Sequence, residues 1–275
     1  MGSMVVAPAH MLKRIKENTK SFFLKRGYQI DRLHPALVAR EVARRMGYTL
    51  APLSPEFPLH PPISGQDLLI LKDPEFRKSI SAVEKHTLLD VARLANLWNL
   101  ARMTGPGKML EIGTFRGGGA LHISNACPNR EMFVFDSFEG FRALKAGLDD
   151  IFGADWFKDT SVEVVQTLFK PYNRKVSVIK GFFPDSAANL DLSGVSFCHL
   201  DVDVYEATRD SLRFLRTRLT PKSLIVLDDF QRGAHGLDKA VREFVSEHPE
   251  FSFFPMFPGQ AALFSTTLWN GAPTL

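Results

Sequence analysis

The sequence predicts an α/β fold in which helices cover both faces of a doubly wound, mostly parallel, seven-stranded sheet. From about residue 66 onward, short apolar stretches alternate with amphipathic stretches of helical period, and this alternation is typical of a parallel sheet between helices. A glycine-rich turn follows the first apolar stretch. Near the C-terminus, Pro258-Gly259-Gln260 joins two apolar stretches, which predicts a hairpin with antiparallel strands at one edge.

Composition narrows the class of protein. The 275 residues, 45% of them hydrophobic, are enough for one large domain and an additional segment. No apolar run reaches the roughly 18 residues that a membrane span needs, and the two cysteines give no disulfide framework. We therefore expect a cytoplasmic protein without a membrane partner. The net charge of +4 is concentrated near the N-terminus, but that stretch lacks a nucleic-acid-binding motif, so a nucleic-acid partner is not favoured.

The chain divides into two predicted regions. Residues 1–65 are expected to form an N-terminal helical and loop extension, in which residues 1–4 (MGSM) look like a remnant of cloning. Its second half carries five prolines within residues 51–65, which resist both helix and central strand. Residues 66–275 are expected to form the α/β domain.

The elements of the α/β domain follow a regular order. Predicted helices carry apolar residues three or four positions apart, and predicted strands are short apolar runs bounded by glycine, proline or aspartate. The expected order is helix 84–103, strand 107–113, a turn into a helix over 114–127, strand 132–138, helix 161–172, strands 175–183 and 195–203, helix 207–219, strand 223–230, helix 237–248 and strands 251–257 and 261–269.

Two pairs of aspartates end two predicted strands. Asp201 and Asp203 stand in CHLDVDVYEAT, and Asp228 and Asp229 stand in SLIVLDDF, 25 residues after Asp203. That interval suits one helix that crosses between neighbouring parallel strands, so all four carboxylates should meet at the carboxyl edge of the sheet, where such folds bind ligands. The alternative for each aspartate is a helix cap. Because one cap per helix suffices, the doubled pairs indicate a hard cation such as Mg²⁺.

The glycine-rich turn LEIGTFRGGGAL indicates a second ligand. Gly113 and Gly117 would let the backbone approach a ligand closely, but the spacing does not match the dinucleotide fingerprint. Asp136 ends the next strand, about 23 residues after Gly113, and is placed to accept hydrogen bonds from ribose hydroxyls. Glu111 is expected either to reach the ammonium group of a ligand or to hold the glycine turn. Together these residues predict a nucleoside-containing ligand and favour S-adenosylmethionine over NAD.

These motifs resemble a known family. LEIGTFRGGG, VFDSFEGF, DTSVEVVQTLF, GFFPDS, HLDVDVYEAT and VLDDF, all in order over roughly residues 84–265, are similar to the metal-dependent S-adenosylmethionine O-methyltransferases of the macrocin and novobiocin type. The resemblance implies a class I, Rossmann-like methyltransferase domain over residues 66–275. It does not cover residues 1–65.

The resemblance also implies roles for individual residues. It assigns Asp201, Asp228 and Asp229 as metal ligands and Asp203 as the position of the general base in some members. Apart from the resemblance, His235, beyond the second aspartate pair, is either an alternative base or simply a loop histidine. The implied cofactor-binding residues are Glu111, Gly113, Gly117, Asp136, Ser137 beside the ribose carboxylate and Asp185 near the adenine. Val204 stands where some members have a histidine base, so that version of the base is not available here. Val202 stands where relatives often have a glycine, a departure that bears on the acceptor pocket and not on the metal.

The function expected on these grounds is a Mg²⁺-dependent transfer of a methyl group from S-adenosylmethionine to a hydroxyl of a sugar or phenol in antibiotic biosynthesis. The partner is then a small hydroxylated acceptor, and residues 1–65 and 142–160 are expected to shape its binding site. Whether the chain forms a homo-oligomer is left open. Two alternatives remain. One is a non-catalytic S-adenosylmethionine-binding protein, and the other is a methyltransferase that acts on RNA.

Overall fold

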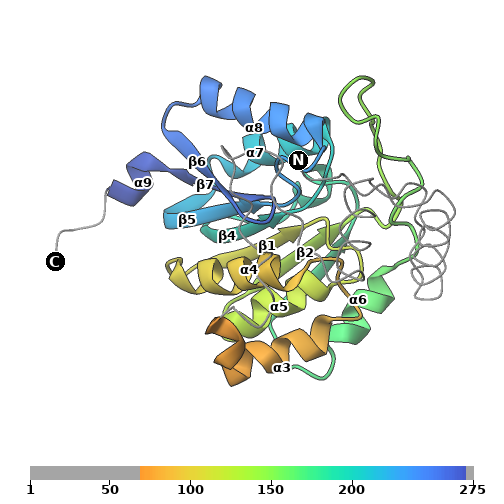
Figure 1. Ribbon diagram of the computed structural model, residues 1–275, viewed down its shortest axis with the longest axis vertical. Coiled ribbons are helices and arrows are strands. Elements are labelled where there is room, and N and C mark those ends of the chain that lie inside the picture. Colours follow the sequence, from red (N-terminus) through yellow and green to blue (C-terminus); the bar gives the residue numbers. More distant parts are fainter. Residues whose placement is uncertain (1–68, 271–275) are drawn as a thin grey trace, which may run out of the picture. The chain divides into compact units, whose positions relative to one another are not determined.

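The computed structural model describes residues 69–270, and its centre is a seven-stranded sheet in the order β3-β2-β1-β4-β5-β7-β6 (Figure 1). The strands are β1 (Lys108–Ile112), β2 (Met132–Asp136), β3 (Val176–Lys180), β4 (Val195–Leu200), β5 (Leu219–Leu227), β6 (Phe251–Met256) and β7 (Gln260–Ser265). Strands β1 to β5 pair in parallel, while β7 runs antiparallel to both β5 and β6. The predicted mostly parallel sheet with a C-terminal hairpin is confirmed.

Helices cover the sheet on both faces. The α-helices are α3 (Pro74–Val83), α4 (Val91–Met103), α5 (Gly118–Ala126), α6 (Val162–Phe169), α7 (Tyr205–Leu215), α8 (His235–Glu247) and α9 (Thr266–Asn270), with short 3₁₀ turns η2 (Leu69–Lys72) and η3 (Asp185–Ala187). On one face, α7 and α8 pack against the strands; on the other, α4, α5 and α6 do so. Strand β4 is buried along its whole length, as expected for a strand covered on both sides.

Among the differences between the observed and the predicted elements are the following three. Helix α4 begins at Val91 instead of residue 84, because the carboxylate of Asp90 accepts a hydrogen bond from the Arg93 amide and caps the helix there. Helix α3, capped by Asp73, was not predicted. The last predicted strand ends early, since Thr266–Asn270 forms α9. The predicted N-terminal extension lies outside the described residues.

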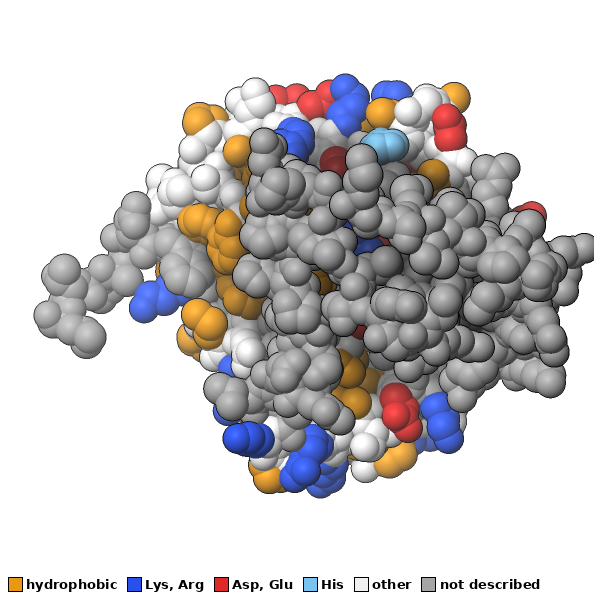
Figure 2. Space-filling model, in the orientation of Figure 1, with side chains coloured by type: hydrophobic (Ala, Val, Ile, Leu, Met, Phe, Trp, Pro, Cys, Tyr) orange, Lys and Arg blue, Asp and Glu red, His pale blue; other side chains and the backbone are white. Residues whose placement is uncertain are grey.

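The surface of the described part mixes both signs of charge. In Figure 2, charged side chains lie along the rims of the visible face, and hydrophobic side chains gather over the region of β5, β6 and β7. Phe254 and Phe257, on β6 and the turn after it, are exposed. Across residues 69–270, no helix has the length and apolar character to cross a membrane.

Candidate functional site

A cavity of about 220 Å³ opens at the carboxyl ends of β1, β2, β4 and β5. Its wall brings together residues that lie far apart in the sequence. From the predicted site residues, the lining contains Glu111, Gly113, Asp136, Ser137, Asp201, Asp203, Asp228 and Asp229. The acidic pairs and the glycine turn therefore face one space.

The two acidic pairs meet because β4 and β5 are parallel neighbours. Asp201 follows the last residue of β4, and its amide donates to the carbonyl of Ile112 in β1 at 2.9 Å. Asp228 follows β5, and its amide donates to the carbonyl of Leu200 in β4 at 3.0 Å. These ladder bonds confirm the predicted convergence of the pairs at one sheet edge.

The second aspartate of each pair has an unusual backbone. Asp203 and Asp229 have φ values of +61° and +53°, in the left-handed region that residues other than glycine seldom occupy. Such conformations cost free energy and tend to occur at functional sites. Here they turn the chain sharply at the ends of β4 and β5, so that both members of each pair reach the cavity wall.

Crowding raises the pKa of three of these carboxyl groups. Burial, together with the charges of Asp228 and Asp203, raises the pKa of Asp201 well above its usual value. Burial and the charges of Asp229 and Asp228 raise the pKa of Asp203 to about 8. Burial and the charge of Asp228 likewise raise the pKa of Asp229. The neighbouring side chains thus leave part of the negative charge uncompensated.

Asp228 differs from the other three because protein donors engage both of its oxygens. Gln260 Nε2 donates to Asp228 Oδ1 at 2.7 Å, and Arg93 Nη1 donates to Oδ2. Burial alone would raise the pKa of Asp228, but the imidazole of His199 and the guanidinium of Arg93 hold it below its usual value. Asp228 is therefore the ionised anchor of the group.

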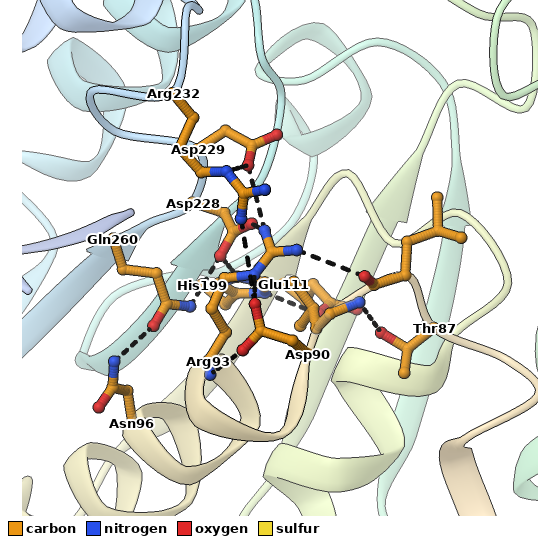
Figure 3. Close-up of polar contacts among 12 residues, drawn as sticks. Thr87, Asp90, Arg93, Asn96, Glu111, His199, Asp228, Asp229, Arg232 and Gln260 are labelled. Atoms are coloured by element: carbon orange, nitrogen blue, oxygen red, sulfur yellow. Dashed lines mark hydrogen bonds and ion pairs between the residues drawn. The ribbon is translucent and has the colours of Figure 1, made fainter. Parts of the chain in front are cut away.

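Arg93 reaches this edge from the first turn of α4 (Figure 3). Besides Asp228, its Nη1 donates to Asp229 Oδ1 at 3.1 Å, its Nε to Asp90 Oδ2 at 3.2 Å and its Nη2 to the carbonyl of Leu88 at 3.3 Å. Burial would lower the pKa of Arg93, but these carboxylates raise it overall. The guanidinium is a fixed positive charge at the acidic edge.

A buried histidine links the glycine turn to the acidic edge (Figure 3). His199 Nδ1 lies 2.8 Å from Glu111 Oε1, while its Nε2 lies 3.7 Å from Asp228 Oδ1, beyond hydrogen-bonding range. Burial would lower the pKa of His199, but the carboxylates of Asp228 and Glu111 raise it to about 10. Glu111 also accepts a hydrogen bond from the Thr114 hydroxyl, so it holds the glycine turn, one of the two roles expected for it.

The glycine turn and Asp136 form the other half of the cavity. Gly113 has φ +87°, and a Cβ added there would lie 1.8 Å from the carbonyl oxygen of Asp201, so a larger residue would separate the turn from the acidic edge. Asp136 accepts hydrogen bonds from the amides of Phe115 at 2.8 Å and Phe138 at 2.7 Å. Burial raises the pKa of Asp136.

An aromatic wall closes the cavity beside the glycine turn. Phe157 packs edge to face against Phe115, with ring centroids 5.5 Å apart, and against Phe141 at 5.8 Å. All three rings line the cavity. Buried Asp149 holds the segment between Phe141 and Phe157 in place, because it accepts hydrogen bonds from the amides of Lys145 at 2.8 Å and Tyr205 at 3.1 Å.

Three predicted residues lie outside the cavity lining. Gly117 has φ +84° and caps α5, and a Cβ there would meet the side chain of Val165 at 2.9 Å, so it serves the turn and its packing. Asp185 is exposed and forms an ion pair with Arg142 at 2.6 Å; Arg142, not Asp185, lines the cavity. His235 is exposed at the first position of α8.

Sequence reasoning missed Arg93 and Gln260. A signal for Arg93 was present, since it lies among Leu94, Leu97 and Ala101 on the buried face of α4, and a charged residue on an apolar helix face needs a partner. Gln260 was assigned to the hairpin turn and carried no such signal.

The residues present fit S-adenosylmethionine. A glycine without room for a Cβ lets the backbone lie close to a ligand, Asp136 at the end of β2 presents carboxylate oxygens to the cavity, and aromatic rings offer a surface for an adenine.

The donor set also fits a divalent cation chemically. Carboxylate oxygens suit Mg²⁺, and the raised pKa values of Asp201, Asp203 and Asp229 indicate negative charge that a cation would relieve. The described residues nevertheless contain no ready-formed cluster of metal ligands, and Arg93 contacts both Asp228 and Asp229.

Comparison with known proteins identifies the family. The profile of the macrocin O-methyltransferase (TylF) family matches residues 81–250. The chain is 25% identical over 58% of its length to a tetracenomycin-C 4'-O-methyltransferase of Streptomyces olivaceus, of which it covers 72%. It is 27% identical over 59% of its length to the mycinamicin III 3''-O-methyltransferase of Micromonospora griseorubida, of which it covers 71%.

Solved structures support the fold. The O-methyltransferase NovP superposes with a TM-score of 0.57 and 23% identity, covering 64% of this chain and 81% of NovP. The calicheamicin methyltransferase CalS11 gives a TM-score of 0.50 and 18% identity, covering 74% of this chain and 94% of CalS11. The family match includes the glycine turn, Asp136 and both acidic pairs. The chain is therefore an S-adenosylmethionine-dependent O-methyltransferase and belongs to the macrocin O-methyltransferase family.

Proposed function

We propose that this enzyme transfers a methyl group from S-adenosylmethionine to a sugar hydroxyl of a natural product, assisted by a divalent cation at the acidic edge. The observation that carries the proposal is the shared cavity of the glycine turn and the four aspartates. Gly113 lies against the carbonyl of Asp201, so a cofactor on the turn and an acceptor at the aspartates would be neighbours.

In this proposal, the cofactor side orients the methyl donor. S-adenosylmethionine supplies an activated methyl group on a sulfonium. Asp136 would accept hydrogen bonds from the ribose hydroxyls, with Ser137 shaping the turn beside it through its hydrogen bond to the carbonyl of Gly140 at 2.9 Å. Glu111 would act through the turn, because both of its oxygens already have protein partners.

The acceptor side activates the hydroxyl. Asp201, Asp228 and Asp229 would hold a divalent cation, which when bound lowers the pKa of a nearby hydroxyl and fixes its position. Asp203 would take the proton, since it lines the cavity beside the proposed cation ligands and burial with the charges of Asp229 and Asp228 raises its pKa, which makes it a stronger base than an ordinary aspartate. His235 is the weaker choice of base because it is exposed and outside the lining.

The names of the relatives support a sugar acceptor. One relative is named for a rhamnosyl-tetracenomycin and another for mycinamicin III. A third relative, 25% identical over 53% of the chain, is a demethyldecarbamoylnovobiocin O-methyltransferase of Streptomyces niveus. The RNA alternative depends on the basic N-terminal region, which lies outside the described residues.

The test is transfer of a labelled methyl group to a panel of deoxysugar glycosides, with matched phenols and a short RNA as competing acceptors. We expect transfer to a glycoside hydroxyl, loss of transfer in a chelator and recovery with added Mg²⁺. Methyl transfer that persists in the chelator would show that the reaction needs no divalent cation. Transfer to RNA alone would show that RNA, and not a sugar, is the acceptor.

A further inference from the structure

Arg93 places a positive charge among the carboxylates that the proposed function assigns to a cation (Figure 3). Its side chain is 9% exposed, and its Nη1 contacts Asp228 and Asp229 together. Asp90 and the carbonyl of Leu88 hold its other nitrogens. The guanidinium is thus fixed by α4 and by the segment before it, and it points at the ends of β4 and β5.

This arrangement leaves each oxygen of Asp228 with only one lone pair for a second cation. Mg²⁺ binds oxygens at about 2.0–2.1 Å in near-octahedral geometry, so it needs a free lone pair in a fixed direction. Arg93 donates to one oxygen of Asp228, and Gln260 donates to the other. A divalent cation at the same oxygens would also be repelled by the guanidinium.

Asp201, unlike Asp228, is not held by Arg93. Among residues 69–270, no side chain of Lys, Arg or His forms an ion pair with its carboxylate within 4.0 Å, whereas Asp228 and Asp229 both have such a partner. Within this part of the chain, the proposed ligand set therefore has one member without an ion-pair partner and two members already held by Arg93.

We propose that Arg93 competes with the divalent cation for Asp228 and Asp229, and that it withdraws from both carboxylates when the cation binds. This inference rests on the proposed cation role of the acidic edge. It makes Arg93 an internal counter-ion that stabilises the cation-free enzyme and weakens its affinity for the cation.

Withdrawal of Arg93 should loosen the segment before α4. Residues 86–89 line the cavity. The carbonyl of Leu88 accepts from Arg93, while the carbonyl of His86 accepts from the amide of Gly118, at the start of α5, at 3.0 Å. Cation binding would break the hydrogen bond from Arg93 to Leu88 and keep the one from Gly118 to His86.

The first test is titration with Mn²⁺, which takes similar oxygen ligands, followed by electron paramagnetic resonance. Wild type is compared with Arg93→Met and with Arg102→Met, a control in the same helix whose exposed ion pair with Asp73 lies away from the cavity. We expect Arg93→Met to bind Mn²⁺ at least about tenfold more tightly, a gain of about 1.4 kcal/mol, and Arg102→Met to bind as wild type does.

The outcomes separate this inference from the proposed function. Equal or weaker binding by Arg93→Met, with clear binding by wild type, would overturn the competition and leave the cation site standing. No binding by either protein would overturn both. Binding by Arg93→Met alone would support the competition in its strongest form.

A second measurement needs no variant, in case Arg93→Met does not fold. Hydrogen exchange of the wild-type enzyme is followed by mass spectrometry with chelator and with saturating Mg²⁺. We expect faster amide exchange in the peptide that covers residues 86–93 when Mg²⁺ is present. Unchanged or slower exchange there would contradict the withdrawal of Arg93.

Discussion

Asp136 shows how one side chain can build a turn and face a ligand at once. Its carboxylate accepts from the amides of Phe115 and Phe138, so it ties the glycine turn to the segment that follows β2. Each carboxylate oxygen has a second lone pair, and the side chain lines the cavity. The same group can therefore serve the fold and the cofactor.

Asp136→Ala should weaken S-adenosylmethionine binding. Loss of hydrogen bonds to a charged group costs about 1.5–3 kcal/mol, so we expect the dissociation constant from calorimetry to rise about ten- to a hundredfold. Asp191→Asn is the matched control, since Asp191 is exposed before β4, at the opposite edge of the sheet, and pairs with Lys108 at 3.1 Å. An affinity for Asp136→Ala within twofold of the control would contradict the assignment.

For individual residues, the sequence predicts where a side chain lies when that residue directly follows a strand. Asp201 and Asp228 are of this kind, because parallel strands bring their carboxyl ends to one edge. Arg93 and Gln260 are not, since their contacts with Asp228 span 135 and 32 residues and depend on how α4 and β7 pack. Asp185 was carried over from the resemblance, and its exposed pairing with Arg142 shows why a motif position alone does not fix a contact.

At the element scale, His122 joins three helices on one face of the sheet. Its Nε2 lies 3.0 Å from the carbonyl of Leu94 in α4, and its Nδ1 lies 2.8 Å from the hydroxyl of Ser79 in α3. Because a carbonyl can only accept, Nε2 carries the proton and Nδ1 accepts from Ser79. Burial lowers the pKa of His122 to about 4, although the bond to Leu94 opposes this shift.

His122 should make stability depend on pH. Its folded pKa lies below the unfolded value of about 6.5, so the unfolded chain takes up a proton first and the stabilisation, complete above pH 6.5, is lost as the pH falls toward 4. Between pH 7 and 5, we expect this group to lower the free energy of unfolding by about 2 kcal/mol. Urea unfolding of wild type and His122→Asn at both pH values measures the difference. The same decrease in both proteins would contradict the prediction.

The segment around Asp149 should be held by that side chain. Asp149→Ala would leave the buried amide of Tyr205 and the amide of Lys145 without their partner, at a cost of about 1–3 kcal/mol for a buried group. We expect a lower free energy of unfolding and faster proteolysis within residues 142–160. Asp150→Ala is the neighbouring control, since Asp150 is exposed and its carboxylate accepts a hydrogen bond from the amide of Gly147. Equal behaviour of the two variants would refute the anchoring role.

Apart from α3 and α9, element types followed from periodicity, whereas element ends depended on contacts. The start of α4 was predicted seven residues early because Leu88 and Leu89 extend the apolar pattern upstream of the helix, whereas the cap at Asp90 sets the start at Val91. The end of β7 was predicted late because residues 266–269 look like a strand; instead the amide of Thr266 bonds to the carbonyl of Glu250 at 2.7 Å as the chain enters α9.

In the whole molecule, one edge of the sheet carries both the proposed cofactor site and the acidic site. The ends of β1 and β2 carry the glycine turn and Asp136, and the ends of β4 and β5 carry the four aspartates. Strand β1 lies between β2 and β4, so the two halves adjoin along one cavity. The alternation of elements predicted a mostly parallel sheet and the meeting of the two acidic pairs, but not the strand order that makes the two halves adjoin. The acceptor specificity was not predictable either, because it depends on loops without a regular pattern.

In the proposed mechanism, three aspartates hold a cation and Asp203 acts as the base. The most direct test is the dependence of kcat on Mg²⁺ concentration for wild type, Asp201→Asn and Asp203→Asn with one glycoside acceptor. We predict that Asp201→Asn shifts half-saturation to higher Mg²⁺, whereas Asp203→Asn keeps the half-saturation but lowers the plateau by about 10²- to 10⁴-fold. A lowered plateau without a shift in Asp201→Asn, or full turnover of Asp203→Asn, would contradict this division of roles.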